Sequence, residues 1–458
     1  MEPTEAPSHA KPQTTTPSNP PTTNTASRSP EEIARLLAGW QITPETHAHI
    51  LHTRILPTVL HPFLPAAEES TANPQPQPQP QPLAVLLLGQ TGAGKTHLAP
   101  LLANAFSQQP PSPFPSPSTS PPQPGSQPLP QHPPLSTPQP TPPGQPPHPN
   151  RRRNPPLHLT ADAYKTHHPH FHTCLAALPA TPHLASRLAG PDAARWLEEV
   201  CAAAAQARVD VLVETACRRG GGGEGMGRLV GGFVQKGYGV RVVVLGVASG
   251  VSWLGVVGRF WRGVMEMEVE KGGEGEVKGD GEGGDGKKGD GGNREKGEGR
   301  EDKEKGGRQC ELGGPMPLRL TPRVVHDESL EGLRGAVGWL DGEGARASED
   351  DKGRVERVVV VRRGLGVVYD NKRIKGGRWE KEPGALKALE REWGRALTEE
   401  ERRTAEEDIK MLMNLKKPDV DREIEEVQKL IAGLGATDGA MPDMVPFDAV
   451  DFIHKELS

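Results

Sequence analysis

The chain has 458 residues, of which 34% are hydrophobic and 4% aromatic, with 54 glycines, 49 prolines and a formal net charge of −5. Both percentages are low for a chain that folds along its whole length, which favours one folded core interrupted by unstructured tracts over several compact domains. A nearly balanced charge provides no overall field that would favour nucleic acid or a membrane surface as a partner.

The cysteines and the N-terminal residues indicate the compartment. Cys174, Cys201, Cys217 and Cys310 lie far apart and form no C-x-x-C pair, which favours reduced thiols over a disulfide framework or a zinc site. The polar N-terminal residues contain neither the apolar core of a signal peptide nor the Arg-rich pattern of a transit peptide. No segment has the roughly 18 consecutive apolar residues that span a bilayer. We therefore expect a soluble, cytoplasmic protein.

The N-terminal third begins with polar and helical segments. Residues 1–28 are rich in Pro, Thr and Ser and predict a disordered tail. A capped helix is expected next, with Ser29 as the N-cap and Glu32 three positions later. A second helical stretch is expected at 47–60, and the alternating Pro-Gln run at 73–82 predicts an extended spacer.

The next segment, LAVLLLGQTGAGKTHL, carries the most specific motif in the chain. Its apolar run, 83–88, predicts a buried parallel strand, and the residues after it fit the spacing G-x-x-x-x-G-K-[ST] of a P-loop. The predicted ATP-binding residues are Gly89, Gln90, Thr91, Gly92, Ala93, Gly94, Lys95 and Thr96. In such a loop the glycines let backbone N–H groups face a polyphosphate, the lysine reaches the β- and γ-phosphates, and the Thr96 hydroxyl binds Mg²⁺. The alternative is a glycine-rich turn without a ligand.

Two tracts of low complexity interrupt the rest of the chain. Residues 106–156 are dominated by Pro, Ser and Gln, and residues 266–312 by Gly, Glu, Lys and Asp. Neither tract contains enough apolar residues to offset the roughly 1–2 kcal/mol per residue that ordering costs, so we expect disordered inserts. The Pro-rich segments are typical of ligands for SH3- or WW-type partners, which leaves a non-catalytic, ATP-binding interaction module as an alternative.

Strand and helix patterns alternate between and after these tracts. Strands are expected at 157–161, 209–213, 240–247, 355–362 and 366–370. Helices are expected at 185–208, with an interruption near Gly190, and at 226–236, 252–264, 384–393, 398–415 and 419–432. This order predicts an α/β fold, with a P-loop NTPase-type parallel sheet flanked by helices and followed by C-terminal helices.

Charged residues follow several predicted strands, at the edge where a parallel sheet binds its ligands. Asp162 follows the second strand and Glu214 the third, so a carboxylate there can accept a proton from a hydroxyl or bind a substrate. Arg259 and Arg319 lie on later segments and would neutralise a migrating phosphoryl group. The less specific alternatives are a helix cap for Asp162, a solvated loop for Glu214 and surface ion pairs for the arginines.

Histidines form two further groups that could be mistaken for a metal site or a catalytic site. His167, His168, His170 and His172 lack an acidic or cysteine partner at metal-ligand spacing, which favours ordinary loop histidines. The pair His326–Asp327 could be mistaken for a catalytic dyad.

Six short motifs follow one another along the chain in a specific order: GQTGAGKT, ADAYKTHHPHF, VLVETACRR, GYGVRVVVLGV, SWLGVVGRF and LRLTPRVVHD. In this order they resemble the zeta toxin family of P-loop kinases, and the likeness spans residues 29–410 without the two inserts. The expected organisation is therefore a tail at 1–28, a zeta-toxin-like kinase domain at 29–435 and a C-terminal tail at 436–458. The long inserts are unlike compact bacterial toxins and favour a eukaryotic, fungal relative.

The resemblance implies ATP-dependent phosphorylation of a hydroxyl on a sugar nucleotide, with UDP-N-acetylglucosamine as the bacterial substrate. It implies that Asp162 is the general base, that Lys95 and Thr96 hold the triphosphate and Mg²⁺, and that Arg259 and Arg319 bind the phosphates. It also implies that Glu214, Arg218 and Lys165 contact the acceptor. Finally, it implies that the pair His326–Asp327 is structural, with a role in capping a helix.

Two residues depart from the family pattern on the acceptor side. Lys165 replaces the usual Arg, and a point charge cannot reproduce a bidentate guanidinium contact. Ala216 replaces the usual Thr and removes a hydroxyl from the expected sugar pocket. The alternative enzyme is a P-loop kinase that acts on a nucleic-acid end or on another metabolite.

Overall fold

The computed structural model describes residues 29–64, 81–108, 154–178, 183–217, 222–273, 320–344, 355–374, 377–435 and 444–455. The expected N-terminal tail and most of both expected inserts lie outside these residues, as does most of the Pro-Gln spacer.

A single mixed sheet organises the described residues. Its strands are β1 (Leu83–Leu88), β2 (Leu157–Thr160), β3 (Val211–Thr215), β4 (Gly239–Gly246), β5 (Val355–Arg362) and β6 (Val367–Lys372). They lie in the order β2-β3-β1-β4-β5-β6; the first five are parallel, and β6 is an antiparallel edge strand beside β5. The expected P-loop NTPase-type α/β sheet is confirmed.

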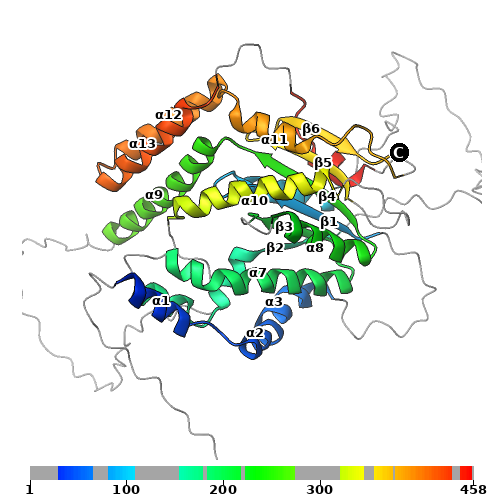
Figure 1. Ribbon diagram of the computed structural model, residues 1–458, viewed down its shortest axis with the longest axis horizontal. Coiled ribbons are helices and arrows are strands. Elements are labelled where there is room, and N and C mark those ends of the chain that lie inside the picture. Colours follow the sequence, from blue (N-terminus) through cyan, green and yellow to red (C-terminus); the bar gives the residue numbers. More distant parts are fainter. Residues whose placement is uncertain are drawn as a thin grey trace, which may run out of the picture.

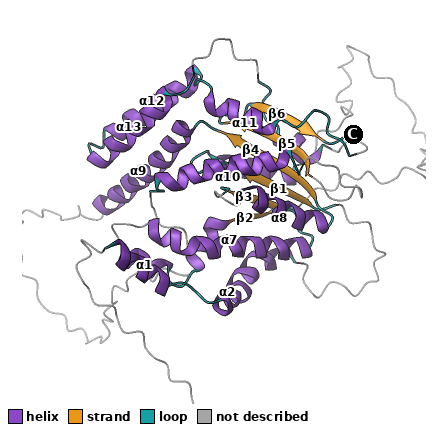
Figure 2. Cartoon of the chain, viewed as in Figure 1, coloured by secondary structure: helices purple, strands orange, loops and turns teal. Residues whose placement is uncertain are grey.

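Helices connect the strands and cover the sheet (Figures 1 and 2). They are α1 (Pro30–Gly39), α2 (Pro44–Ile50), α3 (Leu56–Leu60), α4 (Lys95–Ser107), α5 (Ala161–Tyr164), α6 (Phe171–Ala177), α7 (His183–Gln206), α8 (Gly222–Gln235), α9 (Ser249–Gly273), α10 (Arg323–Asp341), α11 (Ala385–Gly394), α12 (Glu399–Met413), α13 (Pro418–Ala432) and α14 (Ala449–His454). The predicted cap at Ser29 is confirmed, since its hydroxyl accepts the Glu32 N–H. Thr398 forms a capping box with Glu401 at the start of α12.

Both faces of the sheet are buried, which explains why β1 is apolar at every position. Ala84, Leu86 and Leu88 pack with α7, α8, α10 and α11, whereas Leu83, Val85 and Leu87 pack with α4 and α14. Helix α9 leaves the carboxyl end of β4 and packs with α12 and α13 in a separate apolar cluster (Figure 1). The central strands therefore carry the continuous apolar runs that a doubly covered parallel sheet requires.

Helices α7, α9 and α10 are among those that differ from the sequence-based expectation. Helix α7 continues through Pro191, so the interruption expected near Gly190 is wrong; its continuous buried stripe, including Ala185, Leu188 and Trp196, offsets the backbone hydrogen bond that proline removes. Helix α9 extends to Gly273, into the segment expected as an insert. Helix α10 follows that segment and was not expected.

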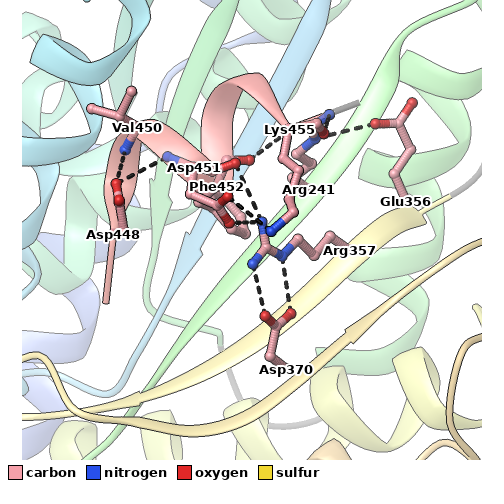
Figure 3. Close-up of polar contacts among 9 residues, drawn as sticks. All are labelled: Arg241, Glu356, Arg357, Asp370, Asp448, Val450, Asp451, Phe452 and Lys455. Atoms are coloured by element: carbon pink, nitrogen blue, oxygen red, sulfur yellow. Dashed lines mark hydrogen bonds and ion pairs between the residues drawn. The ribbon is translucent and has the colours of Figure 1, made fainter. Parts of the chain in front are cut away.

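The C-terminal segment that was expected as a tail contains helix α14, which packs on the sheet (Figure 3). Phe452 is fully buried, and the Arg241 guanidinium donates to its carbonyl oxygen. Arg357 donates to Asp370 at 2.9 and 2.7 Å and to Asp451 at 3.1 Å, while its guanidinium lies 5.4 Å from the Phe452 ring centroid. These contacts join β4, β5, β6 and α14.

A buried chain of charges joins β5 to α11 and α12. Glu392 is only 3% exposed; it accepts hydrogen bonds from the Arg362 Nε and Nη2 at 2.8 and 2.7 Å and from the Arg395 Nε at 2.7 Å. Arg395 also donates to Glu401. Because each of these buried charges is compensated by the opposite charges beside it, removing one of them leaves an uncompensated buried charge and destabilises the fold.

We therefore expect Glu392→Gln to lower the free energy of unfolding by about 3–5 kcal/mol, the usual cost of leaving buried charges uncompensated. The control is Glu390→Gln on the same helix, which removes an exposed pair with Arg334 and should cost less than about 1 kcal/mol. Urea denaturation measures both values. Equal midpoints for the two variants would contradict the account.

Candidate active site

The P-loop connects β1 to α4 and adopts a backbone that requires glycine at two positions. Gly92 and Gly94 have φ values of +81° and +98°, and Gly94 precedes the first residue of α4, Lys95. A Cβ atom added at Gly92 would lie 2.0 Å from the Ser252 carbonyl oxygen and 2.8 Å from Val256, both on α9. Gly92 is therefore required by its left-handed φ and by the close approach of α9.

Lys95 lies at the centre of the candidate site. In this structure its Nζ donates to the Gly89 and Gln90 carbonyl oxygens, at 2.7 and 3.1 Å. Burial lowers the pKa of Lys95, whereas the charges of Glu214 and Asp162 act in the opposite direction. Lys95 is partly enclosed, and its attraction for an anion is therefore stronger than that of a fully exposed ammonium.

Two carboxylates lie at the ends of neighbouring strands, Glu214 in β3 and Asp162 just after β2. Glu214 lies in β3, opposite Leu87 of β1 and Thr160 of β2. Its side chain is 12% exposed and contacts the His158 Nε2 at 2.7 Å. Asp162 follows β2 in the first turn of α5. Its side chain is 63% exposed, and its Oδ1 lies 2.5 Å from the Lys165 Nζ. One carboxylate is thus mostly enclosed and the other is accessible to an acceptor.

Of the four remaining predicted residues, the structure describes two. Arg259 is an exposed residue of α9 whose charge acts on Lys95. Thr96 is exposed in the first turn of α4, so its hydroxyl is accessible. Arg218 and Arg319 lie outside the described residues.

The histidines after Asp162 are mostly enclosed. Burial lowers the pKa of His168 to about 4, although the nearby Asp192 acts in the opposite direction. The His168 Nε2 lies 3.7 Å from Asp192, which also contacts the His47 Nδ1 at 2.9 Å. Within the ranges that the structure describes, no three His, Cys, Asp or Glu residues are grouped so as to hold a metal ion. These contacts join α2 to α7 beside the site.

His326 is not a helix cap, contrary to the sequence-based interpretation. It lies in the first turn of α10, is fully buried and contacts Ser252 of α9 through its Nε2 at 2.8 Å. Ser329, one turn later, contacts the P-loop itself: its Oγ accepts the Thr91 N–H at 3.1 Å. Ser329 was not predicted, because a serine in an unexpected helix carries no motif; only its i, i+3 spacing to His326 could have indicated it.

The fold and the site define a class. The parallel sheet carries a glycine-rich loop after β1, a half-buried P-loop lysine, and acidic residues at the ends of β2 and β3. These features are typical of a P-loop, kinase-like nucleotide-binding protein. More specifically, the model of the zeta toxin family ("Zeta toxin") matches residues 66–111 and 149–272, so the expected resemblance to this family is confirmed.

Other comparisons give less detail. A solved structure from the PezAT chromosomal toxin–antitoxin system of Streptococcus pneumoniae is similar to 85% of this chain and 99% of its own, with 14% sequence identity and a TM-score of 0.42. None of the curated proteins compared with the chain matches it. In the part of the chain that the structure describes, no helix is long and apolar enough to cross a membrane.

Proposed function

We propose that the protein is an ATP-dependent phosphotransferase that moves the γ-phosphate of ATP to a hydroxyl group of a small molecule. One observation carries the proposal: the P-loop lysine, Lys95, begins α4 after β1, while Glu214 lies in the adjacent strand β3 and Asp162 follows the next strand, β2. Arg259 lies on α9, which follows β4 on the other side of β1. These residues come from four separate segments of the chain. A triphosphate, an acceptor base and a charge-neutralising arginine are what phosphoryl transfer requires in one place.

The residues of the loop fit Mg·ATP. Gly92 and Gly94 hold positive φ values, so side chains are excluded where backbone N–H groups must approach a phosphate. Helix α4 begins at Lys95, and its positive end adds to the attraction for a phosphate. The exposed Thr96 hydroxyl would bind Mg²⁺, which neutralises charge on the β- and γ-phosphates when it is bound.

The accessible carboxylate has the properties of a general base. Asp162 is paired with Lys165, and its carboxylate would accept the proton of the acceptor hydroxyl as the new phosphate ester forms. The more enclosed Glu214 would hold the acceptor by hydrogen bonds, together with Lys165 and Arg218. Arg259 and Arg319 would bind the transferred group, whose transition state spreads charge over three oxygens.

A sugar nucleotide resembling UDP-N-acetylglucosamine is the acceptor that the family resemblance favours. Lys165 in place of Arg, and Ala216 in place of Thr, change two positions on the side where that acceptor would bind. A lysine offers a point charge where a guanidinium would offer two parallel hydrogen bonds. The proposal therefore includes related sugar nucleotides with altered contacts to the sugar.

A labelled-phosphate screen tests the proposed reaction. The full-length protein is incubated with γ-labelled Mg·ATP and with single acceptors, including sugar nucleotides, free sugars, nucleosides and nucleic-acid ends. We expect label to appear on one small-molecule class only, and Lys95→Met to abolish its transfer. Label on nucleic-acid ends alone would contradict the proposed acceptor class. Tight binding of ATP without transfer to any acceptor would contradict the proposed reaction and favour an ATP-binding interaction module.

A further inference from the structure

Helix α10 contacts the P-loop through a hydrogen bond of defined polarity. The Ser329 hydroxyl donates its proton to the His326 carbonyl oxygen at 2.6 Å, which leaves the oxygen as an acceptor. That oxygen accepts the Thr91 N–H at 3.1 Å. Ser329 is only 4% exposed, so no solvent competes strongly for the contact. One backbone N–H of the loop is therefore fixed by a side chain that lies 238 positions later in the sequence.

His326 connects α10 to α9, the other helix that touches the loop. Burial lowers the pKa of His326, so the ring is neutral at neutral pH. Its Nδ1 lies 3.0 Å from the Asp327 Oδ1 and its Nε2 lies 2.8 Å from the Ser252 Oγ. The Ser252 hydroxyl also donates to the Ser249 carbonyl oxygen at 3.0 Å, so the ring joins α9 and α10 through these contacts whichever of its nitrogens carries the proton.

The backbone of α9 touches the loop at the next residue, Gly92. The Ser252 carbonyl oxygen would lie 2.0 Å from a Cβ at Gly92, and a Cβ at Gly255 would lie 2.7 Å from the Gly92 carbonyl oxygen. Thr91 is thus held by α10 and Gly92 by α9, while His326 joins the two helices. We call Ser252, His326 and Ser329 the P-loop support.

We propose that Ser329 and His326 are positioning residues that hold the P-loop in its nucleotide-binding conformation. The inference rests on the proposed function, and it concerns residues outside the two stretches that the zeta toxin model matches. A loop with two left-handed glycines has other accessible conformations, in which its N–H groups do not converge on a phosphate. When only a fraction of molecules holds the competent conformation, the apparent affinity falls by that fraction.

The test compares nucleotide affinity with stability in the full-length protein. Ser329→Ala should raise the Kd for Mg·ATP and Mg·ADP about 3- to 10-fold by calorimetry, the range expected for one lost hydrogen bond. The KM for ATP should rise by a similar factor. The control is Val337→Ala, a fully buried residue of α10 about two turns away, which should lower the unfolding temperature without changing either Kd.

Two further variants make the outcome decisive. Ser329→Thr keeps the hydroxyl and should retain most of the affinity for Mg·ATP. His326→Gln leaves Ser329 in place but removes the imidazole that joins α9 and α10, so it should weaken Mg·ATP binding and can be measured even if Ser329→Ala does not fold. Unchanged affinity in Ser329→Ala, or in His326→Gln where Ser329→Ala does not fold, would overturn the inference. Equal weakening in Val337→Ala would also overturn it. Failure of the unmodified protein to bind Mg·ATP would instead contradict the proposed function.

Discussion

Lys95→Met is expected to abolish phosphotransfer while leaving the protein folded. The Lys95 ammonium is the one positive charge within the P-loop motif, and it would contact the β- and γ-phosphates. Removing a preorganised donor of this kind typically lowers kcat by about 10²–10³-fold, so we expect at least that loss in the labelled-ATP assay. The affinity for Mg·ATP should also fall.

Stability separates this effect from simple unfolding. Burial lowers the pKa of Lys95, which means that the folded protein disfavours the charged form relative to an exposed lysine. Replacing it with an apolar side chain of similar length removes that cost, so the unfolding temperature should stay the same or rise. Lys429→Met, at an exposed position of α13, is the control and should retain full activity. A folded Lys95→Met protein with normal turnover would contradict the site.

Asp162→Asn is expected to separate catalysis from nucleotide binding. The substitution keeps the shape of the side chain but removes its capacity to accept the hydroxyl proton, and loss of a general base typically costs about 10²–10⁴-fold in rate. The affinity for Mg·ATP, measured by calorimetry, should change little because the P-loop is intact. Since Asp162 is largely exposed, the loss cannot be attributed to a collapsed core.

Lys165→Gln is the matched control for Asp162→Asn, because both variants break the same ion pair. The control keeps the carboxylate, so it should raise the KM for the acceptor more than it lowers kcat. If Lys165→Gln lost as much kcat as Asp162→Asn, the ion pair and not the base would be responsible. Normal turnover in Asp162→Asn would show that another group accepts the proton.

Local patterns were enough to predict the sheet and the P-loop. The strand 83–88 and the eight residues after it form one continuous signal, because an apolar run and a loop with fixed glycine spacing are both local features. The positions of Asp162 and Glu214 followed from the same logic, since residues after parallel strands meet at one edge of a sheet. In the structure, Glu214 lies in β3 beside β1, and Asp162 directly follows β2 beside β3.

Long-range contacts could not be predicted in the same way. Ser329 contacts Thr91 across 238 positions, and no local pattern marks a serine as the acceptor for a distant backbone N–H. In the sequence, Glu392 is one of many charged residues on a polar helix, yet in the structure it is buried between Arg362 and Arg395. The fold brings Ser329 to Thr91 and Arg362 to Glu392, so these two pairings are visible only in three dimensions.

Calorimetric titration of the intact protein with Mg·ATP tests the central claim most directly. The account predicts saturable binding at one site per chain, strongly weakened in Lys95→Met and largely retained in Asp162→Asn. A folded, unmodified protein that shows no measurable affinity for Mg·ATP would contradict the assignment of residues 89–96 as a nucleotide-binding loop, and with it the proposed phosphotransfer.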